Sequence, residues 1–296
     1  MRSIGPRGSS GHSPVRDFGA RLAHVFGTLG HVCLGIDPHS FLLESWGIPD
    51  TAAGAREFGL RAVDAASGIV GVVKPQVAFF ERFGGAGYSA LEDVLRSARD
   101  AGLLVIADAK RGDVGSTVAA YGSAWLSPGS PLESDAMTAS AYQGVASLSD
   151  VIELASVSGK GIFVLAATSN PESVELQSAV RDRGSWVGAS VAAGIVLEVT
   201  ELNASADSLG PVGVVLGATV RAADYGIDLE QLGKTPILAP GFGEQGALVK
   251  DLSRIYGPAS SSVIVSIGRS VLREGPAGLG DALKRTTEDA ARAFAS

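Results

Sequence analysis

The chain has 296 residues, 46% hydrophobic and 19% charged, which fits one large α/β domain and excludes a disordered chain. Its formal net charge of −7, from 24 basic and 31 acidic residues, argues against a general binder of nucleic acids or anionic membranes. We find no apolar run that approaches the roughly 20 residues needed for a membrane-spanning helix.

The ends of the chain and its cysteine content suggest its organisation. Residues 1–14 lack the apolar segment of a signal peptide, so we interpret them as a flexible tail before a folded domain over 15–296. Cys33 is the only cysteine, which rules out an intrachain disulfide. A cytoplasmic location is the natural expectation.

Eight short apolar runs follow one another along the chain, as expected for strands that are buried on both faces. They cover 31–37, 69–74, 103–108, 135–138, 162–166, 212–217, 236–239 and 263–266. Segments of helical composition lie between them, for example 51–67, 88–101, 187–202 and 278–295. This alternation predicts a single-domain (β/α)8 TIM barrel, with a doubly wound open sheet as the alternative.

Charged and polar residues, and turns rich in glycine, gather where the predicted strands end. In a parallel barrel these ends open on one face, where the active sites of such barrels lie. The residues concerned are Asp37, Lys74, Asp108, Asn170, Pro240, Gly241, Gly268 and Arg269.

Three of these strand-end positions form a candidate charged centre. Because side chains alternate along a strand, Asp108 and Lys110 can point the same way, and Lys74 can extend them into a Lys–Asp–Lys row. Such a row suits chemistry that forms a carbanion, since the neighbouring carboxylates keep Lys110 charged as a general acid. From this spacing alone, a structural ion-pair network is an equal alternative.

Two further chemistries fit the same segment less well. Asp108 and Asp113 could ligate a divalent metal, but the intervening Lys110 argues against a cation there. Lys110 could form a Schiff base, but flanking carboxylates would hold it protonated and make it a poor nucleophile.

Two glycine-rich turns, at 239–246 and 266–270, follow the seventh and eighth predicted strands. Glycines let backbone N–H groups approach an anion, and the fork of Arg269 can bind two phosphate oxygens. Barrels often hold phosphate at these two loops. The sequence therefore predicts a phosphorylated ligand, with two ordinary turns and a solvated arginine as the alternative.

The segment Asp108-Ala-Lys110-Arg-Gly-Asp113-Val-Gly-Ser-Thr117 resembles orotidine 5′-phosphate decarboxylase, in the longer bacterial form typical of actinobacteria. Other segments match in order, at 34–38, 74–76, 167–171, 240–246 and 266–270. The resemblance implies decarboxylation of orotidine 5′-monophosphate to UMP and CO2, the last step of UMP synthesis, without metal or cofactor. It also implies a homodimer with shared active sites, and no nucleic-acid or membrane partner.

The resemblance further implies a role for each matching residue. Lys110 would donate a proton to C6 of the pyrimidine, beside Asp108, which would lie next to the substrate carboxylate. Lys74 would link these charges to the ribose, and Asp113 and Thr117 would enter the partner's site across a dimer interface. The expected substrate contacts are Asp37 to a ribose hydroxyl, Ser169 to the pyrimidine, Gln245, Gly268 and Arg269 to the phosphate, and Pro240 in the same turn as Gln245.

Three positions depart from the family pattern. Ala141 stands where proline is usual, Ala167 stands where arginine is expected, and Glu244 places an acid in the phosphate-side turn. If Glu244 points inward, we expect it to weaken phosphate binding. Two other functions remain alternatives: a magnesium-dependent sugar-phosphate decarboxylase or aldolase of the same superfamily, and a catalytically silent nucleotide-binding homologue.

Overall fold

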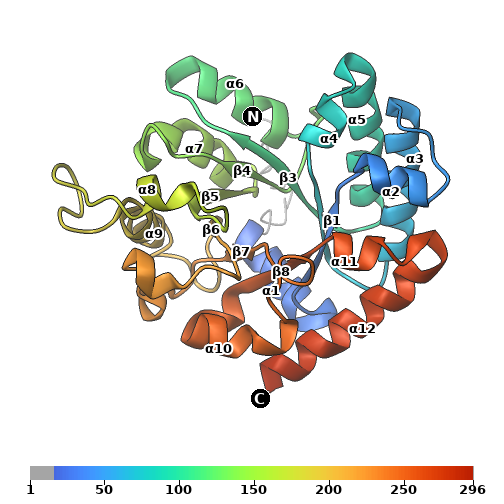
Figure 1. Ribbon diagram of the computed structural model, residues 1–296. Coiled ribbons are helices and arrows are strands. Elements are labelled where there is room, and N and C mark those ends of the chain that lie inside the picture. The colour runs from blue at the N-terminus through green and yellow to red at the C-terminus, as the bar shows by residue number, and fades with distance from the viewer. Residues whose placement is uncertain (1–16, 296) are drawn as a thin grey trace, which may run out of the picture.

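The computed structural model describes residues 17–295, and its strands form one closed parallel barrel (Figure 1). Each strand pairs with the next along the chain, and β8 closes the ring against β1. The strands are β1 Val32–Ile36, β2 Val72–Pro75, β3 Leu104–Arg111, β4 Ala136–Ala139, β5 Gly161–Ala167, β6 Val212–Leu216, β7 Ile237–Ala239 and β8 Val263–Ile267. The predicted TIM barrel is therefore confirmed, whereas the predicted tail over 1–14 lies outside the described residues.

An outer layer of helices surrounds the barrel (Figure 1). The α-helices after β1 are α2 Ser40–Ser45, α3 Ala52–Ala66, α4 Ala78–Glu81, α5 Gly84–Asp100, α6 Gly115–Leu126, α7 Ser149–Val157, α8 Ser173–Gln177, α9 Val191–Leu202, α10 Leu252–Tyr256, α11 Arg269–Leu272 and α12 Gly275–Ala295. Short 3₁₀ segments lie at η1 Val145–Leu148, η2 Ala222–Tyr225, η3 Leu229–Leu232, η4 Val249–Asp251 and η5 Gly257–Ser262. Within residues 17–295, no helix has the combined length and apolar character needed to cross a membrane.

Two connections differ from the sequence prediction. The helix expected from residue 187 begins at Val191, because the Ser190 side chain caps it by accepting the Ala193 N–H. Between β6 and β7 the expected crossover helix is replaced by η2 and η3. Each of these turns ends at a glycine with positive φ, Gly226 at 66° and Gly233 at 48°, a conformation that stops a helix.

The helix that precedes the barrel, α1 Phe18–Leu29, contributes to the core inside the strand ring. Phe18 and Leu22 are fully buried there, and the Phe18 ring meets Phe163 of β5 edge-on at 5.8 Å between centroids. A Cβ on Gly161 would lie 2.5 Å from the Phe18 ring, so glycine is needed for this approach. The helix therefore fills one end of the barrel with apolar side chains.

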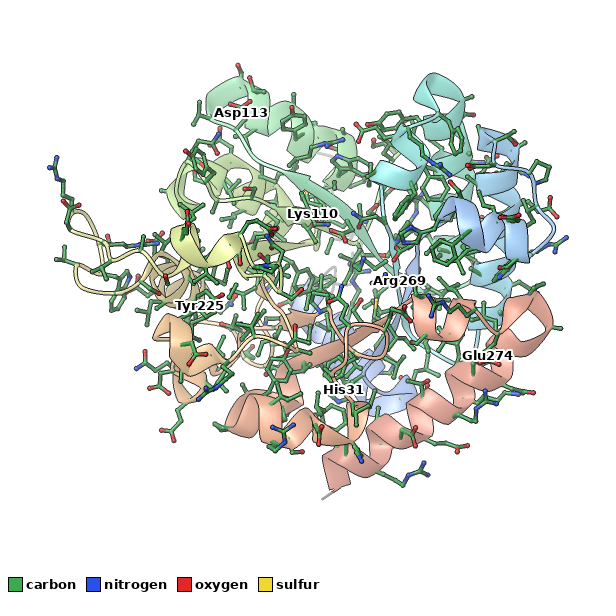
Figure 2. All side chains as sticks on the ribbon, in the orientation of Figure 1. His31, Lys110, Asp113, Tyr225, Arg269 and Glu274 are labelled. Carbon is green, nitrogen blue, oxygen red and sulfur yellow. The ribbon has the colours of Figure 1, made fainter. Side chains whose placement is uncertain are left out.

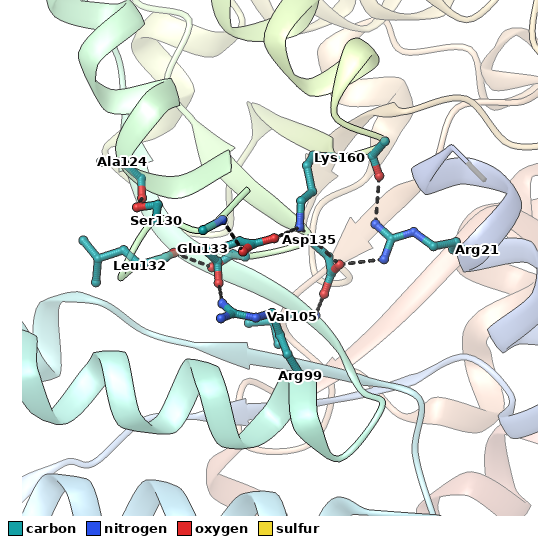
Figure 3. Close-up of polar contacts among 12 residues, drawn as sticks. Arg21, Arg99, Val105, Ala124, Ser130, Leu132, Glu133, Asp135 and Lys160 are labelled. Carbon is teal, nitrogen blue, oxygen red and sulfur yellow. Dashed lines mark hydrogen bonds and ion pairs between the residues drawn. The ribbon is translucent and has the colours of Figure 1, made fainter. Parts of the chain in front are cut away.

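An ion-pair cluster joins α1 to the N-terminal end of β4 (Figure 3). Arg21 Nη1 lies 2.6 Å from Oδ1 of Asp135, whose Oδ2 accepts the backbone N–H of Val105 at 2.9 Å. Lys160 Nζ lies 2.8 Å from Oε1 of Glu133 and 3.7 Å from the Asp135 carboxylate. Apolar packing and ion pairs occupy this end of the barrel, so chemistry is expected at the opposite, C-terminal ends of the strands.

Candidate active site

The Lys–Asp–Lys row expected from the sequence forms at the C-terminal ends of β2 and β3. Lys74 Nζ lies 2.8 Å from Oδ2 of Asp108, and Lys110 Nζ lies 2.6 Å from Oδ1 of the same carboxylate. Lys74 and Asp108 are buried, at 7% and 9% exposed, while the Lys110 side chain is 45% exposed. A single carboxylate thus bridges a buried ammonium and one that is accessible to a ligand.

Burial and ion pairing have opposite effects on the pKa values of Lys74 and Asp108. Burial disfavours the charged forms, but the two lysine ammonium groups hold the pKa of Asp108 well below its ordinary value. Burial also opposes the charge of Lys74, yet the carboxylates of Asp108 and Asp37 raise its pKa above the ordinary value. Asp108 is therefore an anion and Lys74 a cation at neutral pH.

The backbone of Lys110 is unusual. Its φ is 49°, in the left-handed region that residues other than glycine rarely adopt. Here the pairing of β3 with β4 is irregular: Ala107 lies opposite Met137 and Arg111 opposite Ala139. The Lys110 ammonium reaches Asp108 from this bulge, and not by the regular strand alternation that the sequence suggested.

Two more residues contact the charged row, and neither was predicted from the sequence to have a role. The Thr138 hydroxyl on β4 donates to Asp108 Oδ1 and accepts the backbone N–H of Lys110, both at 2.9 Å. Gln76, in the amide orientation that satisfies both neighbours, donates to Asp108 Oδ2 and accepts from Lys110 Nζ. Each residue lies at the C-terminal end of a predicted strand, and this position was the feature of the sequence that could have identified it as a site residue.

A cavity of about 100 Å³ lies beside the row and extends to the phosphate-side turns. Asp37 and Lys74 line it together with the predicted binding residues Pro240, Gln245, Gly268 and Arg269. Oδ1 of Asp37 is buried without a hydrogen-bond partner among residues 17–295. Burial raises the pKa of this carboxyl against the opposing charge of Lys74. An unpartnered buried carboxylate in a cavity is suited to accept hydrogen bonds from a ligand's hydroxyl groups.

The far end of this cavity has the features of an anion site. Within residues 17–295, the Arg269 guanidinium makes no hydrogen bond or ion pair, so its charge is available. The facing turn depends on glycine: Gly243 has a φ of 78°, and a Cβ there would lie 2.5 Å from Ser270 Oγ. Gln245 in this turn accepts a hydrogen bond from Ser169 Oγ at 3.3 Å, which connects the β5 and β7 loops.

Asp113 and Thr117 lie away from the charged row of their own chain. Figure 2 shows Asp113 at the start of α6, well apart from Lys110 and Arg269, which lie near the centre of the strand ring. The Asp113 carboxylate accepts only the N–H of Val114 among the described residues, and Thr117 is exposed. These two predicted site residues are therefore not brought to the charged row within one chain.

The donor set of the row does not resemble a metal site. No group of three or more histidine, cysteine, aspartate or glutamate side chains between residues 17 and 295 could hold a metal ion. A cation at Asp108 would have to displace a lysine ammonium from one of its oxygens. The geometry thus disfavours the interpretation of Asp108 and Asp113 as paired metal ligands.

Comparison with known proteins identifies the family of this chain. Residues 30–278 match the Orotidine 5′-phosphate decarboxylase / HUMPS family. The chain belongs to this family. It is 48% identical to the orotidine 5′-phosphate decarboxylase of Streptomyces coelicolor over 265 residues, which cover 88% of this chain and 92% of that protein. The Salinispora tropica enzyme is also 48% identical, with the same coverage.

Solved structures of the family share the barrel. A candidate orotidine 5′-phosphate decarboxylase from Streptomyces avermitilis superposes with a TM-score of 0.89 at 46% identity, covering 95% of this chain and 97% of its own. The Leishmania donovani OMP decarboxylase gives 0.74 at 28% identity, with 95% and 100% coverage. The resemblance to an orotidine 5′-phosphate decarboxylase of pyrimidine biosynthesis is therefore confirmed.

Proposed function

We propose that this chain decarboxylates orotidine 5′-monophosphate to UMP and CO2 through the Lys74–Asp108–Lys110 row, with no metal or cofactor. The supporting observation is that one buried carboxylate is bound on both oxygens by lysines, beside a cavity lined by Arg269, whose guanidinium has no ion-pair partner within residues 17–295. The row offers charge and a proton at one end, while the cavity offers a phosphate site at the other. A phosphorylated substrate that forms a carbanion requires both.

The cavity suggests how the nucleotide is oriented. We place its phosphate against Arg269, Gln245 and the backbone at Gly268, which line one end. The ribose hydroxyls then donate to Asp37 Oδ1, which is buried without a partner among the described residues 17–295, and the pyrimidine lies near Ser169. This arrangement directs C6 and its carboxylate towards Lys110. Binding the distant phosphate fixes the position of the base and so contributes to the reaction at C6.

The chemistry is the exchange of CO2 for a proton at one carbon. The bond between C6 and the carboxylate breaks, its electron pair stays on C6, and CO2 leaves. The lysine ammonium of Lys110 donates a proton to C6 and regains one from solvent. Preorganised positive charge from Lys110 stabilises the developing carbanion, and Asp108 holds that ammonium in place at 2.6 Å.

We also propose that the enzyme is a homodimer whose subunits share active sites. Asp113 and Thr117 lie at the start of α6, away from their own charged row, where a second copy could receive them. Such an isologous contact would place the same two residues in each site. We further propose a cytoplasmic location, which suits the single, buried and free Cys33.

A direct assay tests this function. Purified protein is mixed with orotidine 5′-monophosphate, with and without a chelator, and UMP and CO2 are quantified. We expect one UMP per CO2 and the same rate in both conditions. A magnesium-dependent sugar-phosphate enzyme would lose activity with the chelator, and a silent nucleotide-binding homologue would bind UMP without releasing CO2.

A further inference from the structure

Thr138 is the only residue of β4 that faces the bulge which carries the charged row. Because Ala107 pairs with Met137 and Arg111 with Ala139, three residues of β3, 108–110, stand opposite this one threonine. Thr138 is 1% exposed, so its hydroxyl is shielded from solvent. The irregular pairing leaves the N–H of Lys110 without a strand partner, and the Thr138 side chain supplies one instead.

The hydroxyl of Thr138 uses its donor and an acceptor position at the same time. It donates to Asp108 Oδ1 and accepts the Lys110 N–H, each at 2.9 Å. A hydroxyl group has one donor and two lone pairs, so both bonds can exist together. One small side chain thus connects the carboxylate of the row to the backbone of the proposed proton donor.

This double contact explains how Lys110 keeps its left-handed backbone. A non-glycine residue at a φ of 49° is strained and persists only where its surroundings enforce it. The hydrogen bond from the Lys110 N–H to Thr138 fixes the backbone, while the ion pair to Asp108 fixes the ammonium. Without the hydroxyl, the partly buried Lys110 N–H would lose this partner and the bulge could relax.

We propose that Thr138 is a positioning residue for decarboxylation, which holds Lys110 and Asp108 in their reactive arrangement without contacting the substrate. This inference builds on the proposed roles of those two residues. The residues proposed to bind the phosphate and the ribose do not lie on β4. Loss of the Thr138 hydroxyl should therefore slow the chemical step and leave nucleotide binding intact. A displacement of about 1 Å at a reacting group costs about 100-fold in rate.

The test compares Thr138→Val, which keeps the side-chain shape, with Thr138→Ser, which keeps the hydroxyl. We expect Thr138→Val to lower kcat about 100-fold, with KM and UMP affinity unchanged, and Thr138→Ser to restore most of the rate. Thr235→Val is the matched control, because Thr235 is also fully buried and hydrogen-bonded but lies at the other end of the barrel, before β7. Wild-type turnover in Thr138→Val, or equal loss in the serine variant, would overturn the proposal.

Two additions keep the test decisive. If the valine variant does not fold, Thr138→Ala is compared with Thr138→Ser, and equal kcat values in these two would refute the role of the hydroxyl. Hydrogen exchange of the Lys110 amide, followed by NMR, needs no activity: it should be slow in wild type and Thr138→Ser and fast in Thr138→Val. A wild-type enzyme that releases no CO2 would contradict the proposed function, whereas unchanged exchange in Thr138→Val would contradict only this inference.

Discussion

The Glu244 carboxylate lies 2.7 Å from Nη1 of Arg273, so the acid in the phosphate-side turn is paired with the C-cap residue of α11. Glu244 nevertheless lines the same cavity as Arg269. The pair therefore neutralises an acid that would otherwise oppose a phosphate. Both side chains are partly exposed, and such pairs contribute little to stability.

Replacing Glu244 by glutamine should favour nucleotide binding. Removing a negative charge from the cavity and releasing the Arg273 guanidinium should tighten UMP binding about threefold, because exposed pairs are worth up to about 1 kcal/mol. The measurement is UMP and uridine affinity for both proteins, with uridine as the control that lacks phosphate. Weaker UMP binding by Glu244→Gln would show instead that the ion pair supports the turn.

Asp37 should lower the stability of the fold while strengthening nucleotide binding. Because burial raises its folded pKa above the ordinary 3.8, ionisation costs folding free energy, and this loss is complete once the pH exceeds the folded pKa. Asp37→Asn should therefore raise Tm at neutral pH, and the difference should narrow as the pH falls towards 3.8. The same change should weaken UMP binding about tenfold, because hydrogen bonds to a charged group are lost.

Thermal melts across pH, with and without UMP, measure both effects. Glu44→Gln is a suitable control, since Glu44 is an exposed acid on α2 near Asp37 in the sequence. A variant Asp37→Asn that is less stable than wild type at neutral pH would contradict the account of this carboxylate.

The ion-pair cluster below the barrel should matter for folding and not for turnover. Asp135→Ala would leave Arg21 and the Val105 N–H without their buried acceptor and would take the more distant carboxylate from Lys160, which keeps Glu133. Breaking a buried pair in this way costs about 3 kcal/mol of unfolding free energy. Denaturant unfolding should show that loss while kcat and KM stay unchanged. A change in kcat in the folded variant would reveal coupling between the two ends of the barrel.

Shared active sites make a prediction about mixtures. Lys110→Ala and Asp113→Ala should each be inactive alone. In a randomly exchanged dimer mixture, half of the dimers are mixed and each has one undamaged site, so about a quarter of wild-type activity should return. No recovery, once subunit exchange has been shown by differently tagged chains, would contradict the shared-site proposal.

The strands and the charged row could be predicted because both depend on local sequence. Apolar runs indicate buried parallel strands, and Asp108, Lys110 and Lys74 lie at their ends. The left-handed backbone of Lys110 could not be predicted, because it depends on the unequal pairing of β3 with β4. The role of Thr138 follows from the same bulge. Likewise, the sequence around Glu244 does not reveal that its carboxylate pairs with Arg273, which lies on another element.

The central claim is that Lys110 donates a proton to C6, and comparing wild type with Lys110→Ala tests it most directly. Metal-stripped wild-type protein and Lys110→Ala are given orotidine 5′-monophosphate labelled in its carboxylate, and released CO2 is counted while UMP affinity is measured separately. We predict rapid release from wild type, a rate up to about 10⁴-fold lower from Lys110→Ala, and similar UMP binding by both. Comparable release from the two proteins would show that the proton comes from another group and that the charged row does not perform the reaction.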